Sequence, residues 1–150
     1  MLKVFQIIFK ENSYGLNNEY EKLSEHEKET IANILPDGYF EFNNDNDKYV
    51  LYLVITELEF KRYLKILMDN LIFFEVKPLS TDLLNGYDLD TALIKYVNPL
   101  NSFRYTTFKK KIDEWILSNL DIDKVLDRIN EVGSIDKLTK LEKNFLENYK

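Results

Sequence analysis

Histidine and cysteine, which carry much of the nucleophilic and metal chemistry of proteins, are almost absent from this sequence. There is no cysteine, and His26 is the only histidine. The composition excludes disulfides, thiolate–zinc sites and cysteine nucleophiles, and a serine triad or a zinc site could use only His26. His26 stands between Glu25 and Glu27 in the first turn of a predicted helix, where we expect an exposed side chain. The sequence therefore predicts no catalytic residue.

Carboxylates at one-residue spacing are the remaining candidates for chemistry. They occur in Asp45–Asp47, Asp88–Asp90 and Asp121–Asp123, and such oxygens can hold a hard cation. A turn explains the first segment, and helix N-caps explain the other two. We therefore predict no metal site and no cofactor. A carboxylate-based or divalent-metal-dependent enzyme stays open as an alternative, because a fold can bring distant carboxylates together.

A short basic stretch is the signal for nucleic-acid binding. Arg104, Lys109, Lys110 and Lys111 give residues 104–111 a charge of +4, with aromatic residues among them. Three consecutive lysines point around nearly the whole circumference of a helix, and Asp113 and Glu114 follow at once, so a solvated helix start explains them better. The glycines form no phosphate-binding loop, and the net charge of −6 repels nucleic acid. A nucleic-acid-associated protein is therefore an alternative, and nucleic acid is a disfavoured partner.

Acidic residues dominate the N-terminal third of the chain. Residues 11–47 contain ten acidic residues and two lysines, a balance of −8. Half of the acidic residues fall on or just before the first predicted helix, at Glu19, Glu21, Glu25, Glu27 and Glu29. A surface of one sign steers an oppositely charged partner and speeds encounter. These five glutamates are therefore the candidate protein-binding residues, and a basic protein would fit them.

The first half of the chain supplies an alternation of strands and helices. Apolar runs predict strands at Leu2–Phe9, Tyr39–Phe42, Lys48–Ile55 and Leu71–Val76. Capping boxes at Ser24 and Thr56 begin two helices between them. The order β-α-β-β-α-β predicts an α+β fold of ferredoxin-like type over residues 1–78. Its antiparallel sheet would carry both helices on one face.

Residues 79–150 form a predicted helical extension. Asp90 would cap a short helix, a longer helix follows from Thr107 with Trp115 on its inner face, and Asp121 caps a third helix that stops at Gly133. The inner face of this third helix is predicted to consist of Ile122, Val125, Leu126 and Ile129. We expect the extension to pack on the sheet unit as a single domain. A separate helical subdomain stays open.

The last predicted helix begins at a capping box of Thr139 and Glu142. This region includes Val125-Leu126-Asp127-Arg128-Ile129, Gly133, Leu138-Thr139, Glu142-Lys143 and Phe145-Leu146. With these residues, positions 122–150 resemble a short helical module at the C-termini of various Bacteroidota and associated phage proteins, some of them rhomboid-like membrane proteins. The module has no assigned activity. The resemblance therefore implies a lineage and a docking element, not a reaction.

Composition and hydropathy complete the prediction. Seventeen lysines against three arginines, with fifteen asparagines, are typical of AT-rich bacterial or phage genomes. The longest apolar run, Tyr49–Ile55, is far shorter than the roughly 20 residues that cross a bilayer, and no signal peptide is expected. We therefore expect a cytoplasmic protein, or a virion component if it is phage-encoded, that does not bind membranes. The predicted function is a non-enzymatic protein-binding domain, such as an immunity-type or anti-defence inhibitor or a small assembly component. The oligomeric state stays open.

Overall fold

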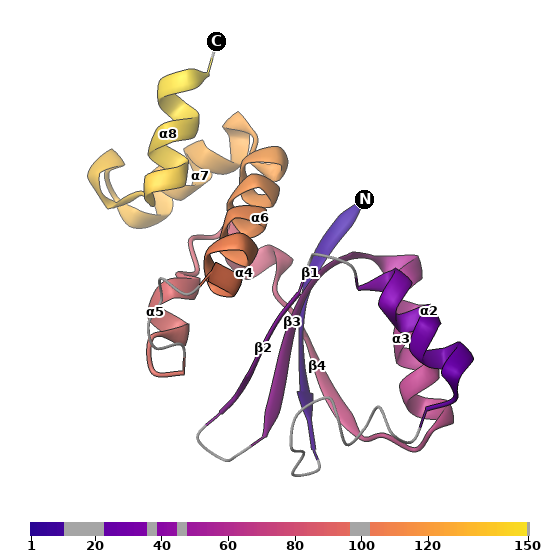
Figure 1. Ribbon diagram of the computed structural model, residues 1–150. Helices are drawn as coiled ribbons and strands as arrows, with labels where there is room; N and C mark the ends of the chain where they lie inside the picture. Colours follow the sequence, from indigo (N-terminus) through magenta and orange to yellow (C-terminus); the bar gives the residue numbers. More distant parts are fainter. Residues whose placement is uncertain (11–22, 36–38, 45–47, 97–102, 150) are drawn as a thin grey trace.

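The structure, a computed structural model, describes residues 1–10, 23–35, 39–44, 48–96 and 103–149 (Figure 1). The chain has a mixed α+β fold, with one antiparallel sheet and a layer of helices on each face of it. Among the predicted site residues, Glu19 and Glu21 lie outside the described residues. The predicted turn at Asp45–Asp47 also lies outside them.

The sheet consists of β1 (Leu2–Phe9), β2 (Tyr39–Asn43), β3 (Tyr49–Thr56) and β4 (Phe74–Pro78). Its strand order is β2-β3-β1-β4, and every neighbouring pair is antiparallel. The strands with the longest apolar runs, β1 and β3, lie in the centre, where both faces of a strand are covered. In β3, Leu51 and Leu53 face one layer of helices, and Val50 and Tyr52 face the other. The predicted burial of this strand on both faces is therefore confirmed.

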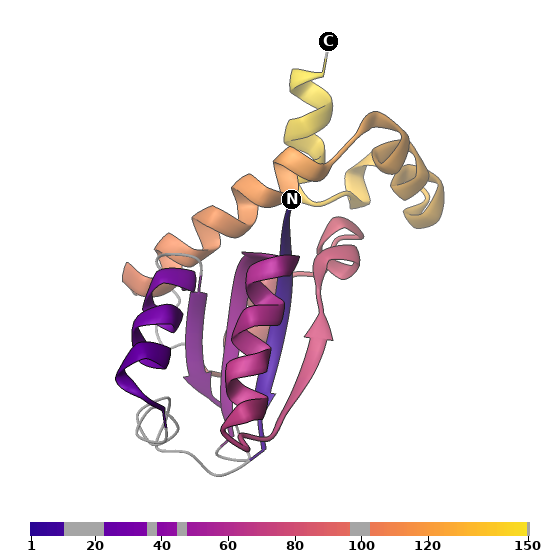
Figure 2. The same ribbon diagram turned by 90° about the vertical axis from the view of Figure 1, so that its right-hand side faces the viewer.

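The first helical layer consists of α2 (Glu25–Ile34) and α3 (Glu57–Asp69), which lie side by side on one face of the sheet (Figure 2). Ile31 of α2 and Phe60, Tyr63 and Leu67 of α3 are buried against β1 and β3. Apolar residues three or four positions apart share one face of a helix, so the stripe predicted for α3 becomes its buried side. The placement of both helices on one face is confirmed.

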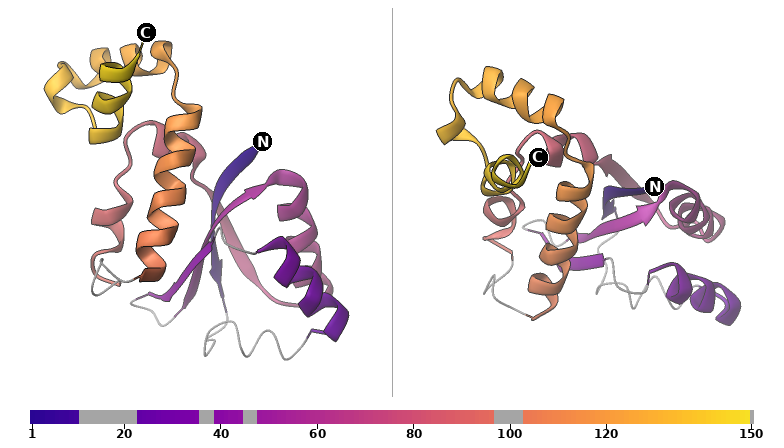
Figure 3. Two further views of the ribbon diagram at one scale, coloured as in Figure 1. Left: turned by 45° about the horizontal axis from the view of Figure 1, so that its top comes forward. Right: turned by 90° about the horizontal axis from the view of Figure 1, so that it is seen from above.

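The second layer covers the opposite face of the sheet with α4 (Ser80–Leu84), α5 (Leu89–Leu93) and α6 (Phe103–Asn119) (Figure 3). Aromatic rings make much of this contact. Phe40 of β2 lies 5.9 Å from the ring of Phe108 and 5.3 Å from that of Tyr105, measured between ring centroids. Trp115 is also buried, as predicted, and its Nε1 donates to the carbonyl oxygen of Leu2 at 2.8 Å. No helix within the described ranges has the length and apolar character of a membrane span.

The chain ends in α7 (Ile122–Val132), the short 3-10 helix η1 (Ile135–Lys137) and α8 (Lys140–Asn148), grouped around one end of α6 (Figure 1). The predicted N-cap at Asp121 and the stop at Gly133, with φ of 92°, are confirmed. The predicted inner face of α7 is partly wrong, because Val125 is fully buried but Leu126 is half-exposed. The two side chains lie about 100° apart around the helix, and the packed face of α7 is narrow.

The beginning of β4 differs from the prediction of a strand over Leu71–Val76. The Leu71 N–H donates to the carbonyl oxygen of Met68 at 3.1 Å, and the Ile72 N–H donates to that of Leu67 at 2.9 Å. This pair of bonds is the Schellman motif, which closes a helix through a left-handed residue. Leu71 occupies that position with φ of 57°. The first residues of the apolar run that begins at Leu71 therefore belong to the end of the helix, and the strand begins at Phe74.

Two helix starts in the second layer also differ from the prediction. Asp88, not Asp90, caps α5, because its carboxylate accepts from the N–H groups of Asp90 and Thr91 at 3.1 and 3.4 Å. The Asp90 carboxylate accepts instead from the Tyr105 hydroxyl. The longer helix, α6, begins at Phe103, four residues before the predicted start at Thr107. The hydrogen bond between Tyr105 and Asp90 joins these two helices, and the local sequence pattern does not contain it.

Candidate functional site

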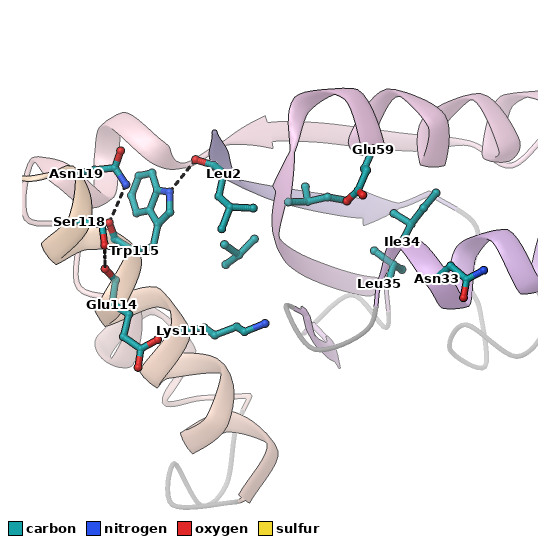
Figure 4. Close-up of a pocket in the computed structure, with 12 residues that line it drawn as sticks. Leu2, Asn33, Ile34, Leu35, Glu59, Lys111, Glu114, Trp115, Ser118 and Asn119 are labelled. Atoms are coloured by element: carbon teal, nitrogen blue, oxygen red, sulfur yellow. Dashed lines mark hydrogen bonds between the residues drawn. The ribbon is translucent and has the colours of Figure 1, made fainter.

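A groove with a volume of about 620 Å³ opens between the two helical layers, over one end of the sheet (Figure 4). Its walls come from α6 on one side and from α2 and α3 on the other, with β1 and β3 between them. The lining residues are Leu2, Asn33, Ile34, Leu35, Val54, Ile55, Glu59, Lys111, Glu114, Trp115, Ser118 and Asn119. The groove therefore joins elements that are far apart in the sequence.

The floor of the groove is apolar because β3 is longer than its neighbour β2 at this end. The pairing of β2 with β3 ends at Tyr39 and Leu53, so Val54 and Ile55 continue beyond it. Leu2, which lies next to them on β1, is half-exposed. Trp115 closes one side, and its hydrogen bond to the Leu2 carbonyl fixes the indole ring. An apolar ligand group in the groove would therefore lie beside an indole ring that this bond positions.

Charged groups rim this apolar floor. Lys111, Glu114 and Ser118 lie on one face of α6 with Trp115, since residues three, four and seven positions apart align on a helix. Figure 4 shows the Lys111 side chain reaching from α6 across the groove. Glu59 of α3 contributes a carboxylate from the opposite wall. In the part of the chain that the structure describes, no ion pair engages the side chains of Lys111, Glu114 or Glu59.

The position of Glu59 corrects one detail of the predicted capping boxes. Thr56 caps α3, and its hydroxyl accepts from the Glu59 N–H at 3.2 Å. The reciprocal bond from the Thr56 N–H to the Glu59 carboxylate, present in the boxes at Ser24 and Thr139, is not formed here. The Glu59 carboxylate is thus available to the groove.

A second, larger cavity of about 1000 Å³ lies on the other side of α6, between α5 and α8. Several of its charged residues are engaged in the fold. Lys109 pairs with Asp113 at 2.9 Å, and Asp90 accepts from the Tyr105 hydroxyl. Hydrogen bonds to Asp88, the shortest from the Thr91 hydroxyl at 2.7 Å, lower the pKa of that carboxyl. These carboxylates stabilise helix ends and helix contacts, which is a structural use.

A buried ion pair includes Glu142, which lines this second cavity. The Arg128 Nε donates to the Glu142 carboxylate at 3.0 Å, and the side chains are 12% and 2% exposed. The same carboxylate accepts from the Thr139 N–H at 2.9 Å, which completes the predicted capping box. Gly86 lies against this pair, since a Cβ there would stand 2.4 Å from an Arg128 guanidinium nitrogen. Among the described residues, no group of three or more potential metal ligands is present.

The predicted nucleic-acid residues lie on α6, but in different environments. Arg104 is 3.7 Å from Glu41, and Lys109 is paired with Asp113. Lys109 lines the second cavity and Lys111 lines the groove, on two sides of the helix. Lys110 is exposed between them. The basic run of the sequence is thus divided among separate surfaces.

The predicted protein-binding glutamates that are described lie on α2. Glu27 accepts from the Ser24 N–H and the Asn70 side chain, at 2.9 and 2.8 Å, and these bonds lower its pKa. Glu25 and Glu29 are exposed, and Glu25 lies 3.4 Å from Lys28. Their four-residue spacing continues to Asn33, so this exposed row leads along α2 into the groove. His26 is exposed in the first turn of α2, as predicted.

Sequence reasoning did not identify the groove itself. The spacing of Lys111, Glu114, Trp115 and Ser118 could have indicated a mixed polar and apolar face of one helix. No sequence signal places that face opposite the end of α2 and the first turn of α3. Comparison of the chain with models of known protein families, with curated proteins and with solved structures finds no match.

Proposed function

We propose that this chain is a non-enzymatic protein-binding domain that holds an apolar segment of another protein, flanked by basic residues, in the groove. The observation that carries the proposal is the combination of an apolar floor with rim charges that form no ion pair with the described residues. Leu2, Val54 and Trp115 supply a surface for an aliphatic or aromatic side chain. Glu59 and Glu114 supply acceptors for a neighbouring lysine or arginine.

The acidic row on α2 favours an extended partner over a small ligand. Glu25 and Asn33, with Glu29 between them, are eight residue steps apart on α2, which corresponds to about 12 Å at 1.5 Å per residue. A small molecule in the groove would not reach Glu25. A polypeptide that leaves the groove along α2 passes both exposed carboxylates, which would raise its rate of association if it is basic. This supports the hypothesis that the partner is a basic protein.

The positions of the reactive groups support binding over catalysis. The single histidine, His26, is exposed on α2 outside the groove. The carboxylates Asp88, Asp90 and Asp113 in the second cavity already hold helix ends or partners together. The charges of the groove surround an apolar floor, which suits recognition of an anchoring side chain.

We also propose that residues 1–78 form a ferredoxin-like unit on which the C-terminal helices pack as a single domain. The element order β1-α2-β2-β3-α3-β4 and the strand order β4-β1-β3-β2 support this topology. The common core of Phe40, Tyr52, Phe108 and Ile112 supports a single domain. In this arrangement the groove lies where the two helical layers diverge.

Selection of displayed random peptides on the immobilised protein tests the function. We expect the enriched peptides to combine an aliphatic or aromatic residue with lysine or arginine. Glu59→Lys and Glu114→Lys should each weaken binding of a selected peptide by about tenfold, since each turns an attraction into a repulsion. Asp127→Lys, the same change at an exposed position of α7, is the matched control and should leave binding unchanged.

The proposal fails if selected peptides bind the groove variants and the Asp127→Lys control equally well. It also fails if the protein binds single-stranded or duplex nucleic acid tightly and loses that binding only when Lys109, Lys110 and Lys111 are replaced by glutamine. The second result would favour the nucleic-acid alternative. Rising salt should slow association more than it speeds dissociation, because exposed charges are screened within roughly 8–10 Å.

A further inference from the structure

In the part of the chain that the structure describes, the strand β4 is an edge of the sheet and pairs only with β1 (Figure 2). The Lys10 N–H donates to the Phe73 carbonyl oxygen at 3.0 Å, and the Leu79 N–H donates to that of Val4 at 2.9 Å. Inward and outward bonding alternate along an antiparallel strand. The odd-numbered residues of β4 therefore bond to β1, and the N–H and C=O groups of Phe74 and Val76 point outward.

The charges of β4 are complementary to those of a second β4 strand that runs antiparallel to it. Glu75 and Lys77 flank Val76 symmetrically, and both charged side chains are exposed. If two copies of β4 pair antiparallel about Val76, Glu75 of each copy faces Lys77 of the other. Opposite charges directly across a strand pair are attractive, whereas like charges in the same place repel. A shift of this register by one residue would lose both charge pairs.

Exposed apolar groups accompany this edge. Val76 is 37% exposed and Phe73, immediately before the strand, is 59% exposed. Leu71, which is 73% exposed, holds its left-handed conformation just upstream. An edge strand with apolar neighbours is a template for pairing with another strand.

We propose that a second copy of this chain pairs with β4 through an antiparallel, two-fold symmetric contact centred on Val76. Val76 exchanges both outward backbone hydrogen bonds with its counterpart. The Phe74 N–H of each copy donates to the Pro78 carbonyl of the other. Proline can occupy this position in that bond because it contributes its carbonyl and not an N–H. Two sheets thereby become one continuous sheet. No residue of β4 lines the groove, so this contact is independent of the proposed function.

Charge reversal with a matched swap tests the contact. Sedimentation over a concentration series should show a dimer for the natural chain. Lys77→Glu places four carboxylates around the two-fold axis and should raise the dimer dissociation constant by about tenfold or more. Glu75→Lys should do the same. The double variant Glu75→Lys/Lys77→Glu restores both attractions and should restore the dimer, whereas Lys110→Glu on α6 should not disturb it.

A cysteine placed at the axis provides a direct test, because the chain contains no other cysteine. Directly opposed residues of a hydrogen-bonded antiparallel pair have Cα atoms about 5.5 Å apart, within the range of about 4.4–6.8 Å that a disulfide spans. Val76→Cys should therefore oxidise readily to a covalent dimer, and Lys110→Cys should not. Circular dichroism melting identifies any variant that has not folded.

Three results would overturn the proposal. The natural chain could sediment as a monomer throughout the series. A dimer could form that is equally stable in the natural chain and in both single reversals, which would place the contact on another face. The swap could fail to recover a dimer that the single reversals had lost. Each result leaves the peptide-binding proposal untouched, since that rests on the groove.

Discussion

Removal of one partner from the buried pair of Arg128 and Glu142 should destabilise the protein strongly. In Arg128→Met the aliphatic part of the side chain is largely kept, but the Glu142 carboxylate, 2% exposed, retains only the Thr139 N–H as a described partner. Breaking a buried ion pair costs about 3–5 kcal/mol. Because Arg128 is 12% exposed and water can reach it, we expect the lower end, about 3 kcal/mol. Total stabilities are about 5–15 kcal/mol, so the loss is easily measured.

The double variant Arg128→Met/Glu142→Met separates the pair from its surroundings. It leaves no buried charge behind, so the remaining loss is mainly the hydrogen bond at the Thr139 N–H, about 1 kcal/mol. The double variant should therefore be about 2 kcal/mol more stable than Arg128→Met alone. Urea unfolding curves, compared at equal slope, give these free energies. Additive losses in the two single variants, or a loss below about 1 kcal/mol for Arg128→Met, would refute a coupled buried pair.

Three further predictions follow from local geometry. Leu71→Gly should stabilise the protein by up to about 1 kcal/mol in urea unfolding, because φ of 57° suits glycine and the leucine side chain is exposed; a clear destabilisation would contradict this reading of the turn. Asp88→Asn should destabilise the protein near pH 6, and the difference should shrink as the pH falls below 3.8. Because the pKa of Asp88 is lowered in the folded protein, its ionised carboxylate contributes stability above pH 3.8, and this stability is lost as the pH falls through the pKa of the folded state. A stability difference between the two proteins that persists in acid would be inconsistent with this reasoning. The fluorescence of Trp115 should be blue-shifted in the native protein and move to the red on unfolding, whereas native emission like that of free indole would indicate an exposed ring.

The elements that depend on local chemistry could be predicted from the sequence. The bounds of β1 agree residue for residue, and the capping boxes at Ser24 and Thr139 form as expected, because a cap requires only residues within one turn. The burial of β3 on both faces also follows from its unbroken apolar run. Where a short segment depends on a distant contact, prediction failed. Asp90 is the clearest case, since its carboxylate accepts from the hydroxyl of Tyr105, 15 residues away, whereas Asp88 caps α5.

The candidate site could be predicted only in part. The acidic character of α2 was visible in the sequence, and Glu25 and Glu29 are exposed. The hydrogen bond of Glu27 to Ser24 could be predicted from the capping box. Its bond to Asn70 could not, because Asn70 is 43 residues away. The groove depends on how far β3 extends past β2 and on which side of α6 faces α2, and both are set by packing. The resemblance of residues 122–150 to a helical module stays a prediction.

The two faces of the sheet are completed at very different times during translation. The strands are all present by Pro78, and so are α2 and α3, which cover one face. The face that carries Phe40, Val50 and Tyr52 must wait for α6, whose last residue is Asn119. Synthesis of the 41 residues from Leu79 to Asn119 takes roughly 2–8 s at about 5–20 residues per second. During that interval the nascent chain displays an aromatic sheet face, which makes it the surface that a ribosome-associated chaperone would need to shield.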